Sequence, residues 1–137
     1  TRAHVVRAVL AGIAHRAADL VAAAGVAAGK PLASLRVDGG MSANPTFLTL
    51  LAEATGLPIE VAPHTECTTL GAGYLAGLGV GLWPDLDAVA AAWAPPSIVE
   101  PDDSAGAPER RLAARAEWAD AIERAAGWIP SLTALDF

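Results

Sequence analysis

Apolar residues recur three or four positions apart over the first 29 residues, which is the period of an α-helix. Charged residues such as Arg7, Arg16 and Asp19 fall on the other faces of this helix. The apolar positions are Val6, Leu10, Ile13, Ala17, Leu20 and Ala24. Either Gly25 or Gly29 can end the helix, and a proline soon after the second glycine prevents its continuation.

Two short apolar runs, 35–37 and 59–61, predict strands on either side of a second helix. That helix begins at the N-cap Asn44, has Pro45 in its first turn and ends at Gly56. Its apolar face consists of Phe47, Leu48, Leu51 and Ala54. Strands that alternate with helices form parallel crossover units, so the pattern predicts an α/β layer. Two strands make a poor open sheet, and we expect further strands to complete it.

Thr65 or Thr68 is expected to cap a third helix that runs to Trp83. Its glycines at 73, 77 and 81 are four residues apart and line one face. This spacing predicts close packing of the helix backbone against a sheet or another helix.

The remaining chain predicts two helices separated by a loop. A short helix follows Pro84, with Asp85 and Asp87 at its start, and residues 94–108 read as an exposed loop rich in proline and aspartate. An amphipathic helix then begins at Glu109. Its repeating positions are Leu112, Arg115, Trp118, Ile122, Ala125 and Ile129.

Composition narrows the class of protein. The 137 residues are the size of one domain, and 53% hydrophobic with 5% aromatic residues predicts a core of Ala, Leu and Val. A net charge of −6 argues against a nucleic-acid or anionic-membrane partner. No continuous apolar run is long enough to predict a membrane span. One cysteine, Cys67, fits a reducing cytoplasm.

The candidate chemistry lies between the first strand and the second helix, at Asp38, Gly39 and Gly40. Backbone N–H groups at the carboxyl end of a strand, followed by the positive end of a helix, favour an anion or a nucleotide. The alternatives are that the glycines only form a turn and that Asn44 only caps the helix. Asp38 caps the turn or binds Mg²⁺ through water.

No other residues form a recognisable catalytic or metal site. His4, His15 and His64 lack metal-ligand spacing with Cys67 and are interpreted as surface or packed histidines. The sequence therefore predicts neither a catalytic residue nor a metal site in this chain. The tryptophans at 83, 93, 118 and 128 are interpreted as packing anchors rather than a sugar platform.

Several spaced motifs together resemble a known family. The stretch VDGGMSANPTFLTLLAEATGLPIEVAPHTECTTLGAGYLAGLGVGLW (37–83) resembles the carboxyl-terminal half of the FGGY carbohydrate kinases, and among them the glycerol-kinase branch. The opening helix also resembles the end of that family's second signature, and the resemblance covers residues 1–128. Ala11 stands where that signature closes on an acid or Gln.

The resemblance implies the second domain of an actin-like ATPase, related to ribonuclease H: an α/β fold with short parallel strands, packed helices and a helical carboxyl terminus. It implies that Gly40 and Asn44, with Gly39 adjoining, contact the adenine nucleotide, and that the GAGYLAGLG helix packs beneath the sheet. In this family ATP, with Mg²⁺, transfers its γ-phosphoryl group to a sugar or polyol hydroxyl.

The resemblance also implies that the catalytic base and most acceptor contacts lie upstream of Thr1. Residues 1–137 are therefore expected to be a piece of the second domain of a longer cytoplasmic kinase, inactive alone and prone to homo-oligomerise. The alternative is a noncatalytic actin-like module that binds a nucleotide or a partner. A Rossmann-type dinucleotide binder is disfavoured because GxGxxG is missing.

Overall fold

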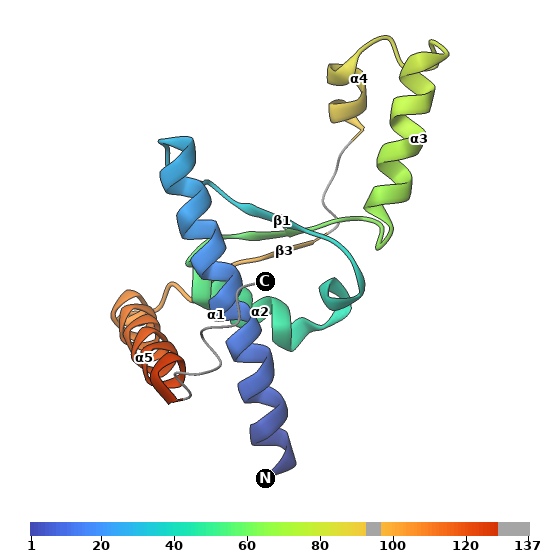
Figure 1. The fold of residues 1–137 in the computed structure, drawn as a ribbon. Helices are drawn as coiled ribbons and strands as arrows, with labels where there is room; N and C mark the ends of the chain where they lie inside the picture. Colours follow the sequence, from blue (N-terminus) through green and yellow to red (C-terminus); the bar gives the residue numbers. More distant parts are fainter. Residues whose placement is uncertain (93–96, 129–137) are drawn as a thin grey trace.

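The computed structural model describes residues 1–92 and 97–128 (Figure 1). Its helices are α1 (Arg2–Ala28), the short 3-10 helix η1 (Gly40–Ala43), α2 (Pro45–Thr55), α3 (Cys67–Gly79), α4 (Leu86–Ala91) and α5 (Ala107–Trp128). Its strands are β1 (Leu35–Val37), β2 (Ile59–Val61) and β3 (Ser97–Val99).

The strands form one small sheet in the order β1-β2-β3. The predicted strands β1 and β2 are confirmed and pair in parallel, with Leu35 opposite Ile59. The third strand was missed. β3 pairs antiparallel to β2, with Val99 opposite Ile59, inside the stretch predicted to be a loop. Ile98 and Val99 favour strands, but a run of three residues is too short to predict one, and the pairing with β2 identifies it. Residues 94–96 of the predicted loop lie outside the described residues.

The hydrophobic core lies where α2 packs against α1 and against the strands β2 and β3. Its buried members are Ala14, Phe47, Leu48, Leu51, Ala52 and Ile59. The predicted face of α2 is confirmed, because Phe47, Leu48 and Leu51 are buried and Ala54 packs against them. Burying a Phe, Leu or Ile side chain contributes about 1.5–3 kcal/mol and drives this part of the fold.

The face of α1 that meets α2 differs from the prediction. Leu10 and Ala17 pack against the core as expected, but Val6, Ile13 and Leu20 remain about half exposed or more. The buried positions are instead Ala14 and Ala18. Ala14 belongs to the core cluster with α2, and its small side chain lets the two helices approach closely.

The end of α1, both ends of α2 and the start of α4 follow the predicted capping. The Oδ1 atom of Asn44 accepts a hydrogen bond from the Phe47 N–H at 3.1 Å, and Pro45 occupies the first turn of α2. Gly29, rather than Gly25, ends α1 with φ of 64°, and Gly56 ends α2 with φ of 66°. The side chain of Asp85 caps α4 through the Ala88 N–H at 2.8 Å. The sequence thus determines these boundaries locally.

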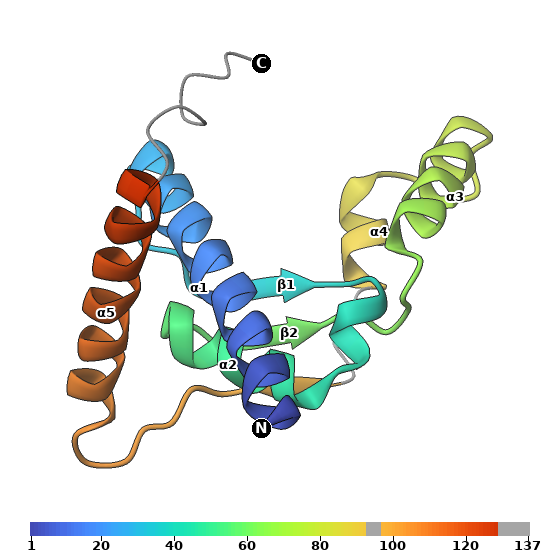
Figure 2. The ribbon, with the colours of Figure 1, turned by 60° about the horizontal axis from the view of Figure 1, so that its bottom comes forward.

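Helices α3 and α4 form an arm that projects away from the sheet (Figures 1 and 2). The resemblance placed α3 beneath the sheet, and the structure contradicts this, since the described contacts between α3 and the strands are few or none. The predicted threonine cap is also wrong. α3 begins after Glu66, and no side chain caps its first turn.

Only one of the three spaced glycines makes a close contact. Gly77 is buried, and a Cβ atom built on it would lie 2.7 Å from Cδ1 of Trp83. Gly73 has open space, and Gly81 lies beyond the end of α3 with φ of 78°. The helix therefore ends at Gly79, and the chain folds back so that Trp83 covers Gly77 and meets Tyr74 edge-on at 5.9 Å. The predicted partner, a sheet or another helix, is replaced by the segment's own tryptophan.

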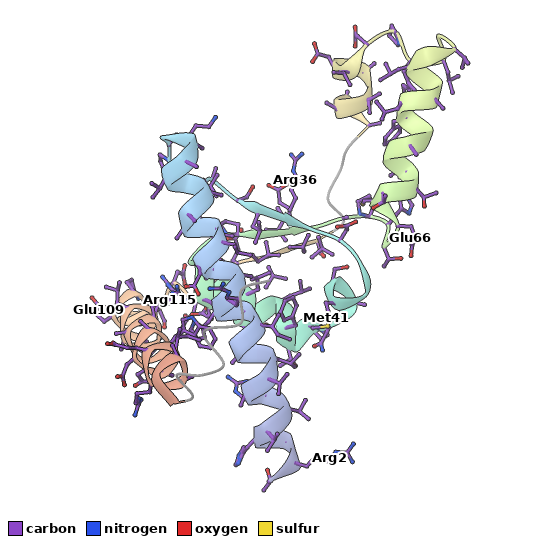
Figure 3. All side chains as sticks on the ribbon, in the orientation of Figure 1. Arg2, Arg36, Met41, Glu66, Glu109 and Arg115 are labelled. Atoms are coloured by element: carbon purple, nitrogen blue, oxygen red, sulfur yellow. The ribbon has the colours of Figure 1, made fainter. Side chains whose placement is uncertain are left out.

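Helix α5 contacts α1 through Arg115, which Figure 3 labels, and through Trp118. Arg115 donates to the backbone oxygen of His15 at 2.9 Å and forms a short ion pair with Asp19. The Nε1 atom of Trp118 donates to Asp19 at 3.0 Å, and its ring stacks on His15 with centroids 5.5 Å apart. We call these four residues the α1–α5 clamp.

The predicted apolar face of α5 is only partly correct, since Leu112 is 71% exposed and Ile122 is 43% exposed. The prediction that tryptophans act as packing anchors is confirmed for Trp83 and Trp118. Trp93, Ile129 and the side chain of Trp128 lie outside the described residues.

Helix α1 is also apolar enough, by length and composition, to cross a membrane, with a mean hydropathy of 1.4 over its best window. The core helix of a soluble protein meets the same criterion when it is mostly buried, whereas only 11% of the apolar stretch of α1 is buried. This single helix is weak evidence, and the expectation of no membrane partner stays a prediction.

Candidate functional site

The loop that joins β1 to α2 contains the predicted glycines in two different conformations. Gly39 has φ of 84°, a region that strongly favours glycine, so the turn itself requires it. Gly40 has no positive φ, and a Cβ atom built on it would find no atom within 4 Å. The described chain therefore gives no steric reason for glycine at Gly40, and the backbone there is open to close approach from outside.

Ser42 holds the turn closed, a role that the sequence analysis did not assign. Its N–H donates to the Gly39 oxygen at 3.0 Å, and its hydroxyl donates to the same oxygen at 2.6 Å. The side chain is buried, which satisfies both groups internally. Turn capping was one of the two roles considered for Asp38. In the structure Ser42 performs that role instead.

Asn44 lies at the rim of a hollow of about 580 Å³ between the N-terminal ends of α1 and α2. The residues that line it are Arg2, Ala3, Val6, Arg7, Leu10, Asn44 and Thr46. The two guanidinium groups and the positive end of α2 make this hollow favourable to an anion. Gly39 and Gly40 precede Asn44 in the same loop but do not line the hollow.

Arg2, Arg7 and Thr46 were missed by the sequence analysis. Nothing in the sequence places the start of α1 beside the start of α2, because that proximity depends on how the two helices cross. The one usable signal is that two arginines occur in the first two turns of a helix, where they oppose the helix dipole. Cations at such positions need another reason to be there.

Asp38 lies at the carboxyl end of β1 and faces Cys67, the first residue of α3. Partial burial raises the pKa of the Cys67 thiol, and the charge and hydrogen bonding of Asp38 raise it further. The thiol also donates to the His64 oxygen at 3.4 Å. A raised pKa keeps the thiol protonated at neutral pH, so Cys67 is a poor nucleophile.

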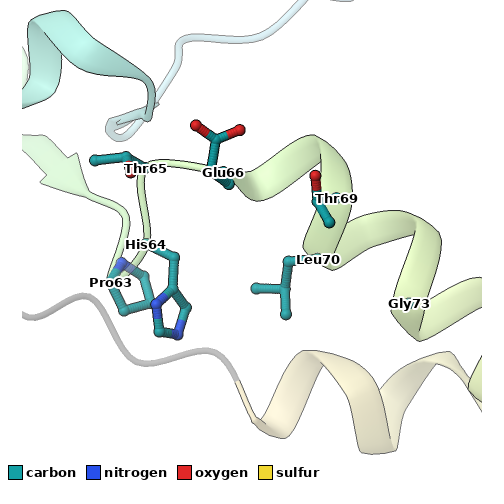
Figure 4. Close-up of a pocket in the computed structure, with 7 residues that line it drawn as sticks. All are labelled: Pro63, His64, Thr65, Glu66, Thr69, Leu70 and Gly73. Atoms are coloured by element: carbon teal, nitrogen blue, oxygen red, sulfur yellow. The ribbon is translucent and has the colours of Figure 1, made fainter.

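A second hollow, of about 630 Å³, lies along the β2–α3 connection (Figure 4). It is lined by Pro63, His64, Thr65, Glu66, Thr69, Leu70 and Gly73. Figure 4 shows His64 and Leu70 pointing to one side of the connection, while Glu66 and Thr69 point to the other. The imidazole and the carboxylate do not converge, so this hollow does not form an acid–base pair.

Within residues 1–92 and 97–128, no group of three or more His, Cys, Asp or Glu side chains could hold a metal ion. Asp38 is a single carboxylate beside an open backbone. Such a group can contribute one ligand to Mg²⁺ when substrate phosphates supply others.

Comparisons with known proteins are consistent across sequence and structure. The profile of the FGGY family of carbohydrate kinases, C-terminal domain, matches residues 1–80. The chain is 45% identical over 127 residues to a glycerol kinase of Aromatoleum aromaticum, covering 93% of this chain and 25% of that protein. It is 42% identical over 128 residues to a glycerol kinase of Dechloromonas aromatica, with the same coverage.

A solved structure is similar as well. The chain matches the crystal structure of Plasmodium falciparum glycerol kinase with ADP, with a TM-score of 0.78 and 34% sequence identity over 90% of this chain and 24% of that one. The chain therefore spans about a quarter of the length of the relatives it matches.

Proposed function

This chain belongs to the FGGY family of carbohydrate kinases, in its C-terminal domain, and we propose that it supplies the nucleotide-binding side of an ATP-dependent polyol kinase. The acceptor class that we propose is glycerol or a related polyol, because the relatives at 45% and 42% identity are glycerol kinases. We assign residues 1–137 to the second, actin-like domain of such a kinase, acting in the cytoplasm.

Two neighbouring observations carry the proposal: the open backbone at Gly40, and the hollow that Asn44 lines four residues later. Gly40 has no steric reason for lacking a side chain, which fits a backbone that a nucleotide approaches closely. The Oδ1 atom of Asn44 accepts a hydrogen bond from the Phe47 N–H. Its amide NH₂ group therefore remains available to donate to a ligand. Arg2 and Arg7 complement a polyphosphate or the polar edge of a nucleoside.

The residues present suit a nucleotide better than a bare metal ion. When bound, ATP supplies the phosphoryl group, and Mg²⁺ offsets the charge of its phosphates. In this chain Gly40, Asn44 and the arginines would hold and orient the nucleotide, while Asp38 would contribute one carboxylate toward the ion. The base that activates the acceptor hydroxyl has no candidate among these residues, so the proposal places it elsewhere in the kinase.

The test measures ADP affinity by calorimetry in the complete kinase. We expect Asn44→Ala to weaken ADP binding by about 1–2 kcal/mol, roughly tenfold, with little change in the polyol KM. Asn44→Ser separates the two roles of the residue, because serine retains the helix cap but removes the amide. Asp85→Ala is the matched control, since it deletes a cap on α4, outside the hollow.

Unchanged ADP affinity in both Asn44 variants would overturn the proposal. A rise in the polyol KM at constant ADP affinity would assign Asn44 to the acceptor side instead.

A further inference from the structure

A smaller cavity, of about 320 Å³, lies between α1, α2 and α5. Its polar lining consists of Arg7, His15, Glu53, Arg110 and Arg111. These residues come from three helices that are far apart in the sequence, and Figure 2 shows α5 running alongside α1 to close this side of the molecule. Arg7 also lines the hollow at Asn44, whereas the other four residues do not.

Positive charge is in local excess in this cavity, although the whole chain carries a net charge of −6. Three guanidinium groups face the single carboxylate of Glu53. Arg111 pairs with Glu53 at 3.6 Å and donates to the Asp102 backbone oxygen at 2.6 Å. Arg110 is neutralised from outside the cavity by Asp102 at 2.6 Å. Each guanidinium has five N–H donors, so both retain donors beyond these contacts.

Arg7 has no such compensation. Within the two described ranges it makes no ion pair or hydrogen bond through its side chain, so its charge is balanced by solvent alone. Arg7 is exposed, so water screens its charge, and its guanidinium donors remain available to an anion in the cavity. The charge arrangement therefore favours an anionic ligand over a neutral one.

His15 can add a neutral donor. Arg115 approaches the Nδ1 atom of His15 at 3.3 Å and can only donate, so Nδ1 is the acceptor and Nε2 carries the proton. The neutral ring thus presents an N–H group without adding to the positive charge. The rest of the wall is apolar and small, formed by Ala11, Leu50, Ala54 and Ala114.

We propose that this cavity binds a small phosphate monoester, with its phosphate on the arginines and a short carbon skeleton on the alanine wall. Arginine suits this role because its planar fork matches two phosphate oxygens at once. The volume of about 320 Å³ admits a phosphate group with a few carbon atoms. This cavity shares only Arg7 with the hollow at Asn44.

The experiment titrates the complete kinase with propyl phosphate, inorganic phosphate and 1-propanol, and follows binding by calorimetry at two salt concentrations. We expect propyl phosphate to bind more tightly than inorganic phosphate, 1-propanol not to bind, and higher salt to weaken both anions. Arg7→Gln should lower the affinity for propyl phosphate about tenfold. Glu53→Gln should raise it about threefold, because glutamine keeps the hydrogen-bond acceptor but removes the repelling charge.

Arg16→Gln is the matched control. It removes the same charge from the same helix at a side chain that is 69% exposed and does not line the cavity. Asn44→Ala should leave propyl phosphate binding unchanged, which separates this site from the proposed nucleotide site. Equal losses in Arg7→Gln and Arg16→Gln, or no gain in Glu53→Gln, would overturn the proposal.

Discussion

The body of the molecule and its arm contain similar apolar side chains that have different surroundings. In the body, formed by α1, α2, α5 and the sheet, Leu51 is 2% exposed and Ile59 is fully buried. In the arm, residues 67–92, Leu75 is 68% exposed and Val80 is 84% exposed. Helical periodicity is present in both regions. The difference shows that a hydrophobic pattern predicts where a helix forms. It does not predict whether the surface that covers the apolar face of the helix belongs to the same stretch of chain.

The same leucine-to-alanine change in each region should produce the largest contrast. Leu51→Ala leaves a cavity in the core and should lower the free energy of unfolding by about 2–5 kcal/mol. Leu75→Ala removes a side chain that is mostly in solvent and should change it by less than about 0.5 kcal/mol. Urea denaturation of both variants measures the contrast. A loss of more than about 1.5 kcal/mol in Leu75→Ala would show that the arm is covered in solution.

Within the body, the α1–α5 clamp should be the next most sensitive feature. Asp19→Ala removes the acceptor of both Arg115 and Trp118. The Asp19 side chain is 29% exposed, so solvent weakens its interactions. We therefore expect the free energy of unfolding to fall by about 1 kcal/mol, which is at the low end for hydrogen bonds to charged groups. Hydrogen exchange should accelerate in α5 and not in α2.

The matched control for the clamp is Asp120→Ala, which deletes an exposed ion pair within α5. If both variants accelerate exchange equally, the clamp does not hold α5 in place.

In the arm, the contact between Gly77 and Trp83 can be tested directly. Gly77→Ala places a Cβ atom 2.7 Å from the indole, so Trp83 must move. The indole is only partly buried and can rotate. We therefore expect the stability of the arm to fall by less than about 1 kcal/mol. Chemical shifts of the Trp83 side chain should change, with the unfolding midpoint of the body unaltered. Gly73→Ala, which has open space, is the control.

The smallest expected effect is the pH dependence of the stability that the α1–α5 clamp provides. Burial, and then the charge of Arg115, lowers the pKa of His15 below its ordinary value of 6.5. The unfolded chain therefore takes up this proton first, and stability decreases as the pH falls below 6.5. Hydrogen bonds from Arg115 and Trp118 lower the pKa of Asp19 below 3.8, so its contribution is present above that pH and is lost in stronger acid.

Acidification should therefore loosen α5 in two steps, which the Trp118 indole N–H resonance can follow. His15→Gln should abolish the upper step and retain the lower one. A profile unchanged by this substitution would assign the upper step to another group.

Elements whose signals are local were predictable from the sequence. β1, β2 and α2 follow the predicted boundaries because Asn44, Pro45 and Gly56 determine them within a few residues. The candidate site was predictable in its loop for the same reason, through Gly39, Gly40 and Asn44. The assignment of these three residues to a nucleotide remains a proposal.

Features that depend on tertiary contacts were not predictable. β3 is too short to predict without its pairing with β2, and Ala14 of α1 joins the core only where the two helices approach closely. Arg2 and Arg7 adjoin Asn44 only after that crossing is formed. The fold-back of Trp83 onto Gly77 ended α3 earlier than its periodicity indicated.

The clamp also has a consequence for the order of folding. Arg115 and His15 are 100 residues apart in the chain, whereas β1, α2 and β2 are consecutive. Closing so long a loop costs conformational entropy that no early contact repays, so we expect α5 to dock late, after a nucleus of β1, α2 and β2 has formed. Asp19→Ala should then accelerate unfolding and leave the folding rate unchanged, giving a φ-value near zero in stopped-flow kinetics. A φ-value near one would place α5 in the nucleus.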